Sequence, residues 1–339
     1  MKKTENTVRC PRCRWPLAAA VALLLAGTLA APAFTTSDRS LAYGAYNNNM
    51  YFTLANGTQG YYRIQDGSGT PTSFWQFAEQ IELACDAADT TVVNQLCTGF
   101  TTHNGTDWSG NAYNDDLMWA AIAFTRAYLL TGNTTYRTLA KNGFNTAYNR
   151  GYDTVNGGMW WNTSKQTKNA CVNFPAAIAG YLLYTAGAGS TYRTKGQNCY
   201  TWGKNNFFVS SSGLVKDSTV SSASYTYNQG TFGGAAYYFG EGGNATLSFN
   251  YVKNTYGTAM QGFGTGSDAG GFNGICLRWM AKAGFDTTYL RNVCNQAGGY
   301  RNSRGLTSND WTQRSSDTAS LYSWDCSSMV VGLLCVPPG

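Results

Sequence analysis

Two adjacent aspartates, Asp115 and Asp116, open a segment that is otherwise almost entirely apolar, YNDDLMWAAIAF at 113–124. An apolar run of this kind predicts a buried helix. Adjacent residues on a helix diverge by about 100°, so side chains that lean toward one opening can bring their carboxyls to about 5 to 6 Å. At that separation one carboxylate can attack an anomeric carbon while the other protonates the leaving oxygen, as in retaining glycosidases.

The position of the pair at the start of a helix suits this chemistry. Asn114 or a neighbour can cap the helix, and the positive end of the helix dipole stabilises an ionised nucleophile. The second carboxyl needs a raised pKa, which the neighbouring negative charge and partial burial can provide. The alternative is that both are ordinary N-terminal helix acids holding an arginine, and the spacing alone does not decide between the two.

Other kinds of chemistry find little support in the sequence. His103 is the one histidine of the chain, and no nucleophile motif surrounds any serine or cysteine, which disfavours Ser-His-Asp and Cys-His mechanisms. The same count excludes histidine-rich metal sites, and the sequence has neither a Walker A motif nor a dinucleotide fingerprint. We therefore expect no metal and no cofactor.

Aromatic residues are abundant, at 14% of the chain with 23 tyrosines and 10 tryptophans, and many stand beside Asn, Gln or Asp. A sugar site needs this mixture, because sugar rings have apolar faces and polar edges. Packing of a core between helices is the alternative for most of these residues. Trp160 and Trp161, in a glycine-flanked segment, fit either role equally well.

The elements that must position these residues repeat as pairs of helices. AFTRAYLLTGNTTYRT (123–138) aligns with AAIAGYLLYTAGAGSTYRT (176–194), and weaker copies follow at 234–252 and 276–293. Each copy has an apolar helix, a glycine turn, a polar cap and a more polar helix. The apolar stripe of the second helix in the first pair consists of Tyr136, Leu139, Ala140, Gly143, Phe144 and Ala147.

This repeat predicts an all-α fold, an (α/α)6 toroid of helix pairs. A period near 50 in a mature chain of roughly 306 residues gives about six pairs, the number at which such a ring closes. An open solenoid is the alternative, but it would need capping repeats. Segments 156–162, 224–234 and 267–274 recur near the inner helices, so we expect them on one face, which becomes the candidate site.

Residues 1–33 have the features of a secretory signal peptide. Basic residues precede an apolar run at 17–30, and Ala-Pro-Ala at 31–33 fits a cleavage site. The run is too short for a good membrane span. The remainder, 34–339, has no linker and is expected to form a single secreted, extracellular domain.

Charge gives no sign of a nucleic-acid or membrane partner. Removal of the signal segment takes five of the 24 basic and one of the 18 acidic residues, leaving 19 against 17. A net charge of about +2 without a Lys/Arg cluster provides no electrostatic footprint for either partner.

Cysteines and sequons agree with secretion. Five N-glycosylation sequons stand at Asn56, Asn104, Asn133, Asn162 and Asn244. An even number of cysteines behind a signal peptide predicts up to four disulfides, so we expect a disulfide-stapled domain. The cysteines are Cys85, Cys97, Cys171, Cys199, Cys276, Cys294, Cys326 and Cys335.

Three segments together resemble glycoside hydrolase family 76, the endo-α-1,6-mannanases and their cell-wall relatives. They are YNDDLMWAAIAFTRAYLLTGN, NGGMWWNTSKQTKNACVNFPAAIAGYLLY and YTYNQGTFGGAAYYF, in this order at helix-pair spacing. The likeness runs, with gaps, from about Phe74 to about Met280. It implies an (α/α)6 toroid and retaining hydrolysis of α-1,6-linked mannose. The expected partner is a mannan-type polysaccharide or oligosaccharide, and we expect a monomer.

The resemblance also implies roles for single residues. Asp115 matches the nucleophile, and Asp116 matches the general acid and base. The residues that match the family's motif segments and would line the sugar cleft are Asn114, Trp160, Trp161, Lys168, Asn169, Asn173, Tyr227, Asn228 and Gln229. In the FNGI segment Asn273 replaces an expected lysine, and the residues before Phe74 and after Gly299 match nothing in the pattern.

Two other functions stay open. A cell-wall transglycosidase would transfer the mannosyl intermediate to another sugar, but relatives of that kind are usually membrane-anchored, and the C-terminal SSMVVGLLCVPPG does not resemble an anchor signal. The third possibility is a non-catalytic mannan-binding protein on the same fold. A lectin has no need of two carboxylates at one point, which argues against it.

Overall fold

The computed structural model describes residues 34–339, and the expected signal peptide at 1–33 lies outside the described residues. The described part forms 12 α-helices, one short 3-10 helix (Gly257–Ala259) and two small antiparallel hairpins. The prediction of a predominantly helical fold is therefore confirmed.

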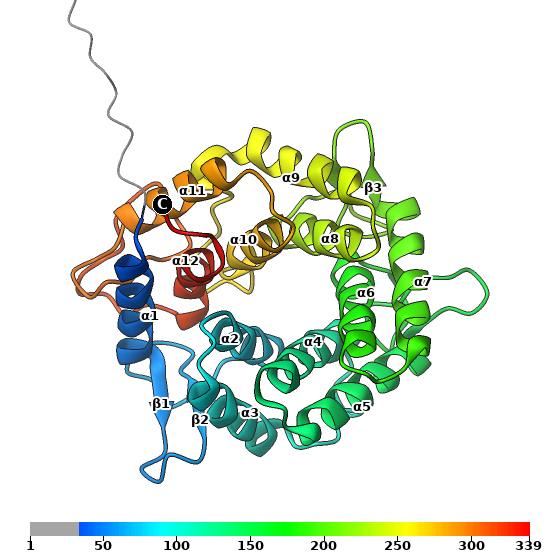
Figure 1. Ribbon diagram of the computed structural model, residues 1–339, viewed down its shortest axis with the longest axis horizontal. Helices are drawn as coiled ribbons and strands as arrows, with labels where there is room; N and C mark the ends of the chain where they lie inside the picture. The colour runs from blue at the N-terminus through cyan, green and yellow to red at the C-terminus, as the bar shows by residue number, and fades with distance from the viewer. Residues whose placement is uncertain (1–33) are drawn as a thin grey trace, which may run out of the picture. The chain divides into compact units, whose positions relative to one another are not determined.

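Six helices form an inner layer around a central axis (Figure 1). Each packs against the next one in the layer, and the last packs against the first, which closes the layer. The inner helices are α2 (Phe74–Asp86), α4 (Asn114–Thr131), α6 (Ala170–Thr185), α8 (Thr226–Tyr238), α10 (Phe272–Lys282) and α12 (Ser323–Cys335).

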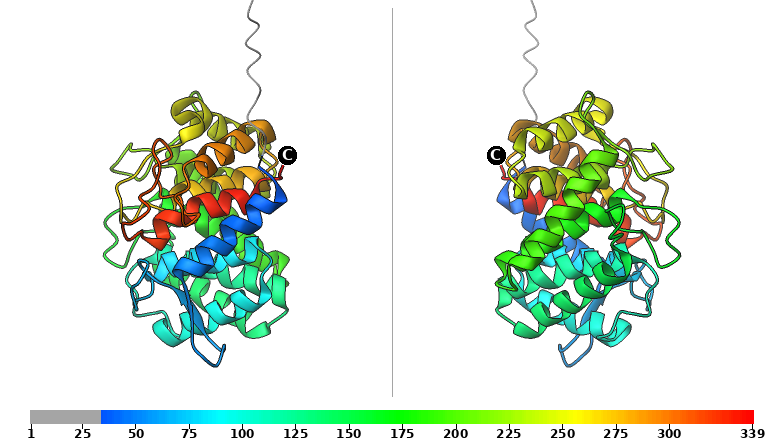
Figure 2. Two further views of the ribbon diagram at one scale, coloured as in Figure 1. Left: turned by 90° about the vertical axis from the view of Figure 1, so that its left-hand side faces the viewer. Right: turned by 90° about the vertical axis from the view of Figure 1, so that its right-hand side faces the viewer.

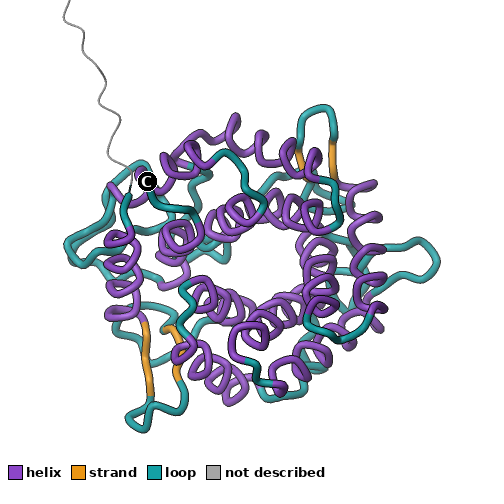
Figure 3. Tube along the Cα trace, viewed as in Figure 1, coloured by secondary structure: helices purple, strands orange, loops and turns teal. Residues whose placement is uncertain are grey.

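The other six helices form an outer layer that surrounds the first, as the tube in Figure 3 shows. The outer helices are α1 (Thr36–Met50), α3 (Thr90–Asn104), α5 (Thr134–Gly151), α7 (Ser190–Phe207), α9 (Gly242–Tyr256) and α11 (Thr287–Gly299). Seen from the side, the longer loops gather on one side of the ring (Figure 2). These loops precede inner helices, as the recurrence of loop segments in the sequence predicts.

The two hairpins are short connections between helices. Strand β1 (Tyr51–Thr53) pairs with β2 (Gly60–Tyr62) between α1 and α2, and β3 (Phe208–Val209) pairs with β4 (Leu214–Val215) between α7 and α8. Neither pair extends into a larger sheet, so helix packing determines the architecture.

The first helix pair shows how the sequence produces the two layers. Helix α4 is buried on nearly every side, whereas α5 buries the predicted stripe together with Tyr148 and Gly151. Gly132 ends α4 in a left-handed conformation with φ of 75°, which glycine adopts without strain. The side chain of Asn133 then caps α5 by accepting a hydrogen bond from the backbone N–H of Thr135.

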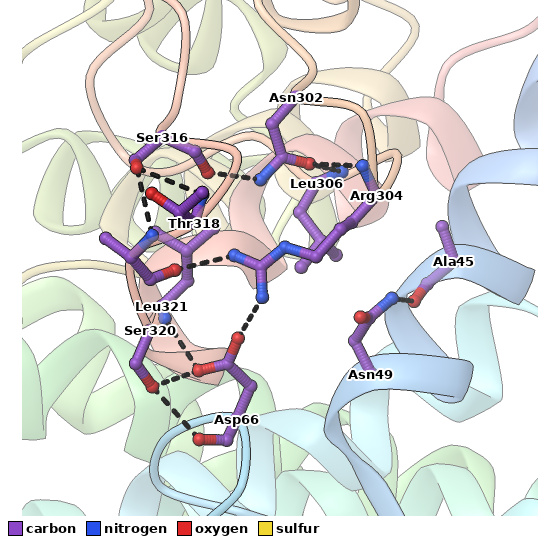
Figure 4. A network of polar contacts seen from close by, with 11 residues as sticks. Ala45, Asn49, Asp66, Asn302, Arg304, Leu306, Ser316, Thr318, Ser320 and Leu321 are labelled. Atoms are coloured by element: carbon purple, nitrogen blue, oxygen red, sulfur yellow. Dashed lines mark hydrogen bonds and ion pairs between the residues drawn. The ribbon is translucent and has the colours of Figure 1, made fainter.

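The segment between α11 and α12, which the sequence left unassigned, is fixed by polar contacts to the loop after β2 (Figure 4). Asp66 pairs with Arg304 and accepts a hydrogen bond from the backbone N–H of Leu321 at 2.8 Å. The side-chain oxygen of Asn302 accepts from the backbone N–H of Arg304 at 3.0 Å. Because α12 begins directly after this segment, these contacts also hold the start of α12 in place.

The structure corrects the prediction of a disulfide-stapled domain. Among residues 34–339 no disulfide is present, and all eight cysteines are free. Six of them are buried within helix packing, where a thiol behaves as a small apolar group. Composition and an even count therefore predicted bridges that the positions of these side chains do not form.

A buried ionic cluster occupies the C-terminal end of the inner layer. Arg278 contacts Glu79 at 2.6 Å and Asp86 at 2.8 Å, and Arg126 contacts Asp86 and Glu82. All three carboxylates are at most 3% exposed. Burial and the charge of Glu82 raise the pKa of Glu79 to about 8, so this carboxyl takes up a proton near neutral pH.

This cluster borders a cavity of about 460 Å³, which we call the rear cavity. Its wall is formed by residues near the C-terminal ends of the inner helices, including Asp86, Arg126, Tyr238, Arg278 and Cys335. Two carboxylates of the cluster, Glu79 and Glu82, do not line it. The charged groups at this end of the ring are therefore engaged mainly with one another.

Candidate active site

A second cavity, of about 350 Å³, opens at the N-terminal end of the inner layer, and we call it the front cavity. Its wall contains three carboxylates and six aromatic residues of the inner helices and loops, and none of the residues that line it, all within the described range, is positively charged. The lining residues are Ser73, Trp75, Tyr113, Asp115, Asp116, Trp119, Trp161, Tyr227, Asp268 and Phe272.

The aspartate pair lies in the first turn of α4, which Asn114 fixes to neighbouring segments. The backbone N–H of Asn114 donates to the carbonyl of Trp161 at 2.8 Å, and its side-chain amide donates to the carbonyl of Trp160 at 2.9 Å. The Asn114 side-chain oxygen accepts from Nε of Arg150 at 2.7 Å. Asn114 is fully buried, so it positions the pair rather than lining the cavity.

The two oxygens of Asp115 have different surroundings. Oδ2 accepts hydrogen bonds from Nε1 of Trp161 at 2.9 Å and from the thiol of Cys171 at 3.3 Å. Oδ1 is buried and has no hydrogen-bond partner within the described part of the chain. One oxygen thus holds the carboxylate in place, and the hydrogen-bonding capacity of the other is unused in this part of the chain.

Asp116 is held less tightly than its neighbour. Its Oδ2 accepts one hydrogen bond, from the side-chain amide of Asn111 at 2.8 Å. Burial raises its pKa, and the charge of Asp268 contributes to the rise against the effect of Asn111. Burial and the charge of Asp116 also raise the pKa of Asp115, against the two hydrogen bonds it accepts. Two buried carboxyls that repel each other retain one proton near neutral pH.

Aromatic rings form much of the remaining wall of the front cavity. Tyr227 and Phe272 stack with ring centroids 3.7 Å apart. Trp75 lies edge-on against Trp324 at 4.8 Å, and its Nε1 donates to Oδ1 of Asp268 at 2.9 Å. This hydrogen bond joins the start of α2 to the loop before α10, so the wall is held together across the ring.

Two of the nine predicted binding residues, Trp161 and Tyr227, line the front cavity together with the aspartate pair. The other seven are not among the residues that line it, and their expected contact with sugar stays a prediction. These seven are Asn114, Trp160, Lys168, Asn169, Asn173, Asn228 and Gln229.

Lys168 illustrates why these residues lie elsewhere. Its ammonium group pairs with Oδ2 of Asp153 at 2.7 Å and donates to the carbonyl of Gly157 at 2.6 Å. The same group lies 4.5 Å from the ring centroid of Trp160 and 5.0 Å from that of Trp202. Lys168 and Trp160 therefore fix the loop that presents Trp161, a role that the motif does not distinguish from sugar binding.

The buried amides also have structural partners. Asn173 binds the backbone N–H and carbonyl of Met159, and Gln229 donates to the carbonyl of Val215. Asn228 donates to Oδ1 of Asp217 at 3.1 Å. Asn169 precedes α6 and accepts a hydrogen bond at its carbonyl from Asn173 at 2.9 Å. These amides shape the loops behind the cavity wall.

Several residues of the front cavity were not predicted. Trp119 lies one turn after Asp115 in the same helix, so helical spacing could have indicated it. Asp268 belongs to the loop segment 267–274, which was predicted to lie on the site face without a residue being assigned. Trp75 and Phe272 open inner helices far away in sequence, and no local pattern links them to the aspartates.

The remaining features of the described residues place no second chemistry at this site. His103 is exposed in the last turn of α3, edge-on to Tyr61. No group of three or more potential metal ligands is found among residues 34–339. In the same part of the chain, every helix is too short or too polar to cross a membrane.

A comparison with protein families decides the relationship of the chain. Residues 45–297 match the sequence model of Glycosyl hydrolase family 76. The chain belongs to glycosyl hydrolase family 76. This confirms the resemblance drawn from the three sequence segments. No match was found among curated proteins.

Solved structures share the family 76 fold. The GH76A α-1,6-mannanase from Salegentibacter sp. HEL1_6 superposes with a TM-score of 0.75 at 24% identity, covering 88% of this chain and 98% of that chain. An inactive variant of that enzyme, with two consecutive aspartates replaced by alanine and α-1,6-mannotetrose bound, gives 0.76 at 23% identity over 88% and 98% of the chains. Dfg5 from Chaetomium thermophilum, in complex with glucosamine, gives 0.67 at 15% identity over 89% and 91%.

Proposed function

We propose that this protein is a retaining glycoside hydrolase that cleaves α-1,6-mannosidic linkages in mannan, with Asp115 as nucleophile and Asp116 as general acid and base. The observation that carries the proposal is the aspartate pair in the front cavity, where Oδ2 of Asp115 is anchored and Oδ1 has no hydrogen-bond partner among residues 34–339. Membership of family 76 supports it. So does the similar mannanase, whose variant lacking two consecutive aspartates is inactive.

In the first step, Oδ1 of Asp115 attacks the anomeric carbon while Asp116 donates its proton to the departing glycosidic oxygen. This requires an ionised Asp115 and a protonated Asp116. The two hydrogen bonds to Oδ2 favour the ionised form of Asp115, and so does the positive charge that develops on the sugar ring. Burial raises the pKa of Asp116 to about 6 and that of Asp115 to about 8, so the one proton of the pair must pass to Asp116 as positive charge develops on the sugar beside Asp115.

In the second step, Asp116 acts as a base. It removes a proton from water, the resulting oxygen attacks the anomeric carbon, and the bond to Asp115 breaks with net retention. The aromatic wall offers stacking surfaces for the apolar faces of mannose, and Asp268 offers an acceptor for its hydroxyls.

The wider setting is part of the proposal. We infer that residues 1–33 are a signal peptide, that the protein is secreted and extracellular, and that it acts as a monomer. The closed inner layer of six helices and the six helices outside it support treating residues 34–339 as one (α/α)6 toroid domain.

Transfer to a second sugar is the other candidate function. The observation that favours it is the likeness to Dfg5, whose structure contains glucosamine. The same pair would serve in this reaction, because a sugar hydroxyl can take the place of water in the second step.

The test is release of reducing ends from linear α-1,6-mannan by the wild type, Asp115→Asn and Asp116→Asn. Asp317→Asn, which changes an exposed aspartate on another loop, is the matched control. We expect release by the wild type and the control and loss in both pair variants. Release from an α-1,2-linked mannan instead would contradict the linkage, and products that lengthen when free mannose oligomers are added would favour transfer.

A further inference from the structure

A thiol lies beside the proposed nucleophile. Cys171 is the second residue of α6, and its sulfur is 3.3 Å from Oδ2 of Asp115. The side chain is 5% exposed, and the helix start is fixed by a hydrogen bond from the backbone N–H of Ala170 to the carbonyl of Asp217 at 2.8 Å. The sulfur is thus held at this distance by the fold.

We infer that Cys171 is a positioning residue for Asp115, with its S–H donating to Oδ2 so that Oδ1 faces the substrate. The inference rests on the proposed function and deepens it. Two donors, Trp161 and Cys171, meet the same oxygen from different segments, which restricts rotation of the carboxylate. The other oxygen, Oδ1, has no hydrogen-bond partner in the described part of the chain, so the carboxylate is held through Oδ2 and Oδ1 is left for the reaction.

Tyr227 belongs to the same cavity wall as Asp115. It stacks on Phe272 with ring centroids 3.7 Å apart. The aromatic wall that would contact sugar is therefore adjacent to the carboxylate that Trp161 and Cys171 anchor.

The chemistry of a buried thiol suits this role. Burial, followed by the charges of Asp115 and Asp217, raises the pKa of Cys171 well above its usual value. The group therefore stays protonated over the working pH range and does not act as a nucleophile itself. As a donor it is weak, so it can orient Asp115 without strongly reducing the reactivity of the carboxylate.

The experiment compares the wild type with Cys171→Ala, which lacks the donor, and Cys171→Ser, which keeps one. Cys199→Ala, a buried cysteine on the outer helix α7, is the control for loss of a buried thiol. The first readout is the pKa of Asp115, followed by the ¹³C shift of its carboxyl in protein labelled at aspartate. The signal is assigned by its disappearance in Asp115→Asn.

The second readout is the pH profile of kcat/KM on linear α-1,6-mannan. In Cys171→Ala we expect the pKa of Asp115 and the acidic limb of the profile to move to higher pH, because the ionised form loses a donor. We expect kcat near neutral pH to fall about tenfold. Cys171→Ser should bring the pKa of Asp115 and kcat back toward their wild-type values, and Cys199→Ala should leave both unchanged.

The outcomes separate the two proposals. An unchanged pKa of Asp115 in folded Cys171→Ala would overturn the positioning role, whatever the activity. A raised pKa with a wild type that is inactive on every mannan would uphold the hydrogen bond and reject the proposed function. A fall in kcat that Cys171→Ser does not relieve, without a change in the pKa of Asp115, would indicate a packing role and also overturn the inference.

Discussion

The front and rear ends of the inner ring both gather carboxylates, but they surround them with different partners. At the rear, Glu79 and Asp86 contact Arg278 directly, and a second arginine completes the cluster. At the front, Asp115 and Asp116 share a cavity whose lining residues, all within the described range, carry no positive charge. Burial is common to both ends, so the difference lies in whether a cation accompanies the buried acids.

This difference separates a structural cluster from a reactive one. Buried acids with arginine partners hold helices together, and the arginine charges lower the pKa of Asp86 although burial alone would raise it. Glu79, which also lies beside the negative charge of Glu82, keeps a raised pKa in spite of its contact with Arg278. Buried acids without cations keep a raised pKa and destabilise the fold, which is typical of catalytic groups. Removing single charges at each end should therefore have opposite effects on stability.

The largest effect is expected at the front. Asp115→Asn should reduce kcat on α-1,6-mannan by about 10⁴-fold or more, because the nucleophile is lost. The same change should raise the free energy of unfolding at pH 7 by about 1 kcal/mol, because the repulsion between two buried carboxyls disappears. Urea denaturation beside the activity assay measures both. A variant that is inactive and also less stable would indicate a damaged fold.

The rear should respond in the opposite direction. Arg278→Met leaves Glu79 and Asp86 buried without this partner, and we expect the free energy of unfolding to fall by about 3 to 5 kcal/mol. Lys204→Met is the matched control, because the Lys204–Glu241 pair is partly exposed and should be worth at most about 1 kcal/mol. Equal losses in the two variants, measured in urea, would remove the distinction between buried and surface pairs.

The pH dependence of the free energy of unfolding should reflect carboxyls at both the front and the rear of the inner ring. The pKa of Glu79, about 8, and those of the aspartate pair exceed their values in the unfolded chain. The folded protein therefore binds protons at these three carboxyls more tightly than the unfolded chain does. Their contribution to the free energy of unfolding is complete below about pH 4 and is lost as the pH rises through about 8. Glu79→Gln should flatten the decline between pH 5 and 8, measured by thermal melting. A decline as steep as that of the wild type would show that Glu79 does not titrate there.

The smallest effect is expected from Asp268 at the rim of the front cavity. Its charge contributes to the raised pKa of Asp116. Asp268→Asn removes that charge, so the basic limb of the kcat/KM profile should move to lower pH, with KM raised about threefold by loss of an acceptor. Asp310→Asn, which changes a half-buried aspartate on another loop, provides the baseline. A basic limb that stays in place would mean that Asp268 does not act on Asp116.

Local patterns were sufficient for the helices and for the aspartate pair. The stripe of α5, the burial of α4 and the cap at Asn133 follow from residues within one or two turns of each other. Asp115 and Asp116 could be identified because they are adjacent and interrupt an apolar helix. Trp161 could be predicted because it belongs to one of the three motif segments. The structure places it next to the aspartate pair, where it donates a hydrogen bond to Asp115.

Long-range partners account for what the sequence did not reveal. Lys168 is a residue type that often binds ligands, but its ammonium group already contacts Asp153 and two tryptophan rings. Asp268 reaches the site through a loop whose position depends on Trp75, from a helix at the other end of the chain. Cysteine count predicted disulfides, whereas the sulfur of Cys171 faces a carboxylate instead of another sulfur.

The central claim is that Asp115 and Asp116 work as a nucleophile and acid pair in the front cavity. The most direct measurement is a ¹H NMR time course of the reducing end formed from linear α-1,6-mannan in the first minutes of the reaction. Retention predicts that the α-anomer appears first and the β-anomer follows by mutarotation. Initial formation of the β-anomer would contradict a covalent intermediate on Asp115.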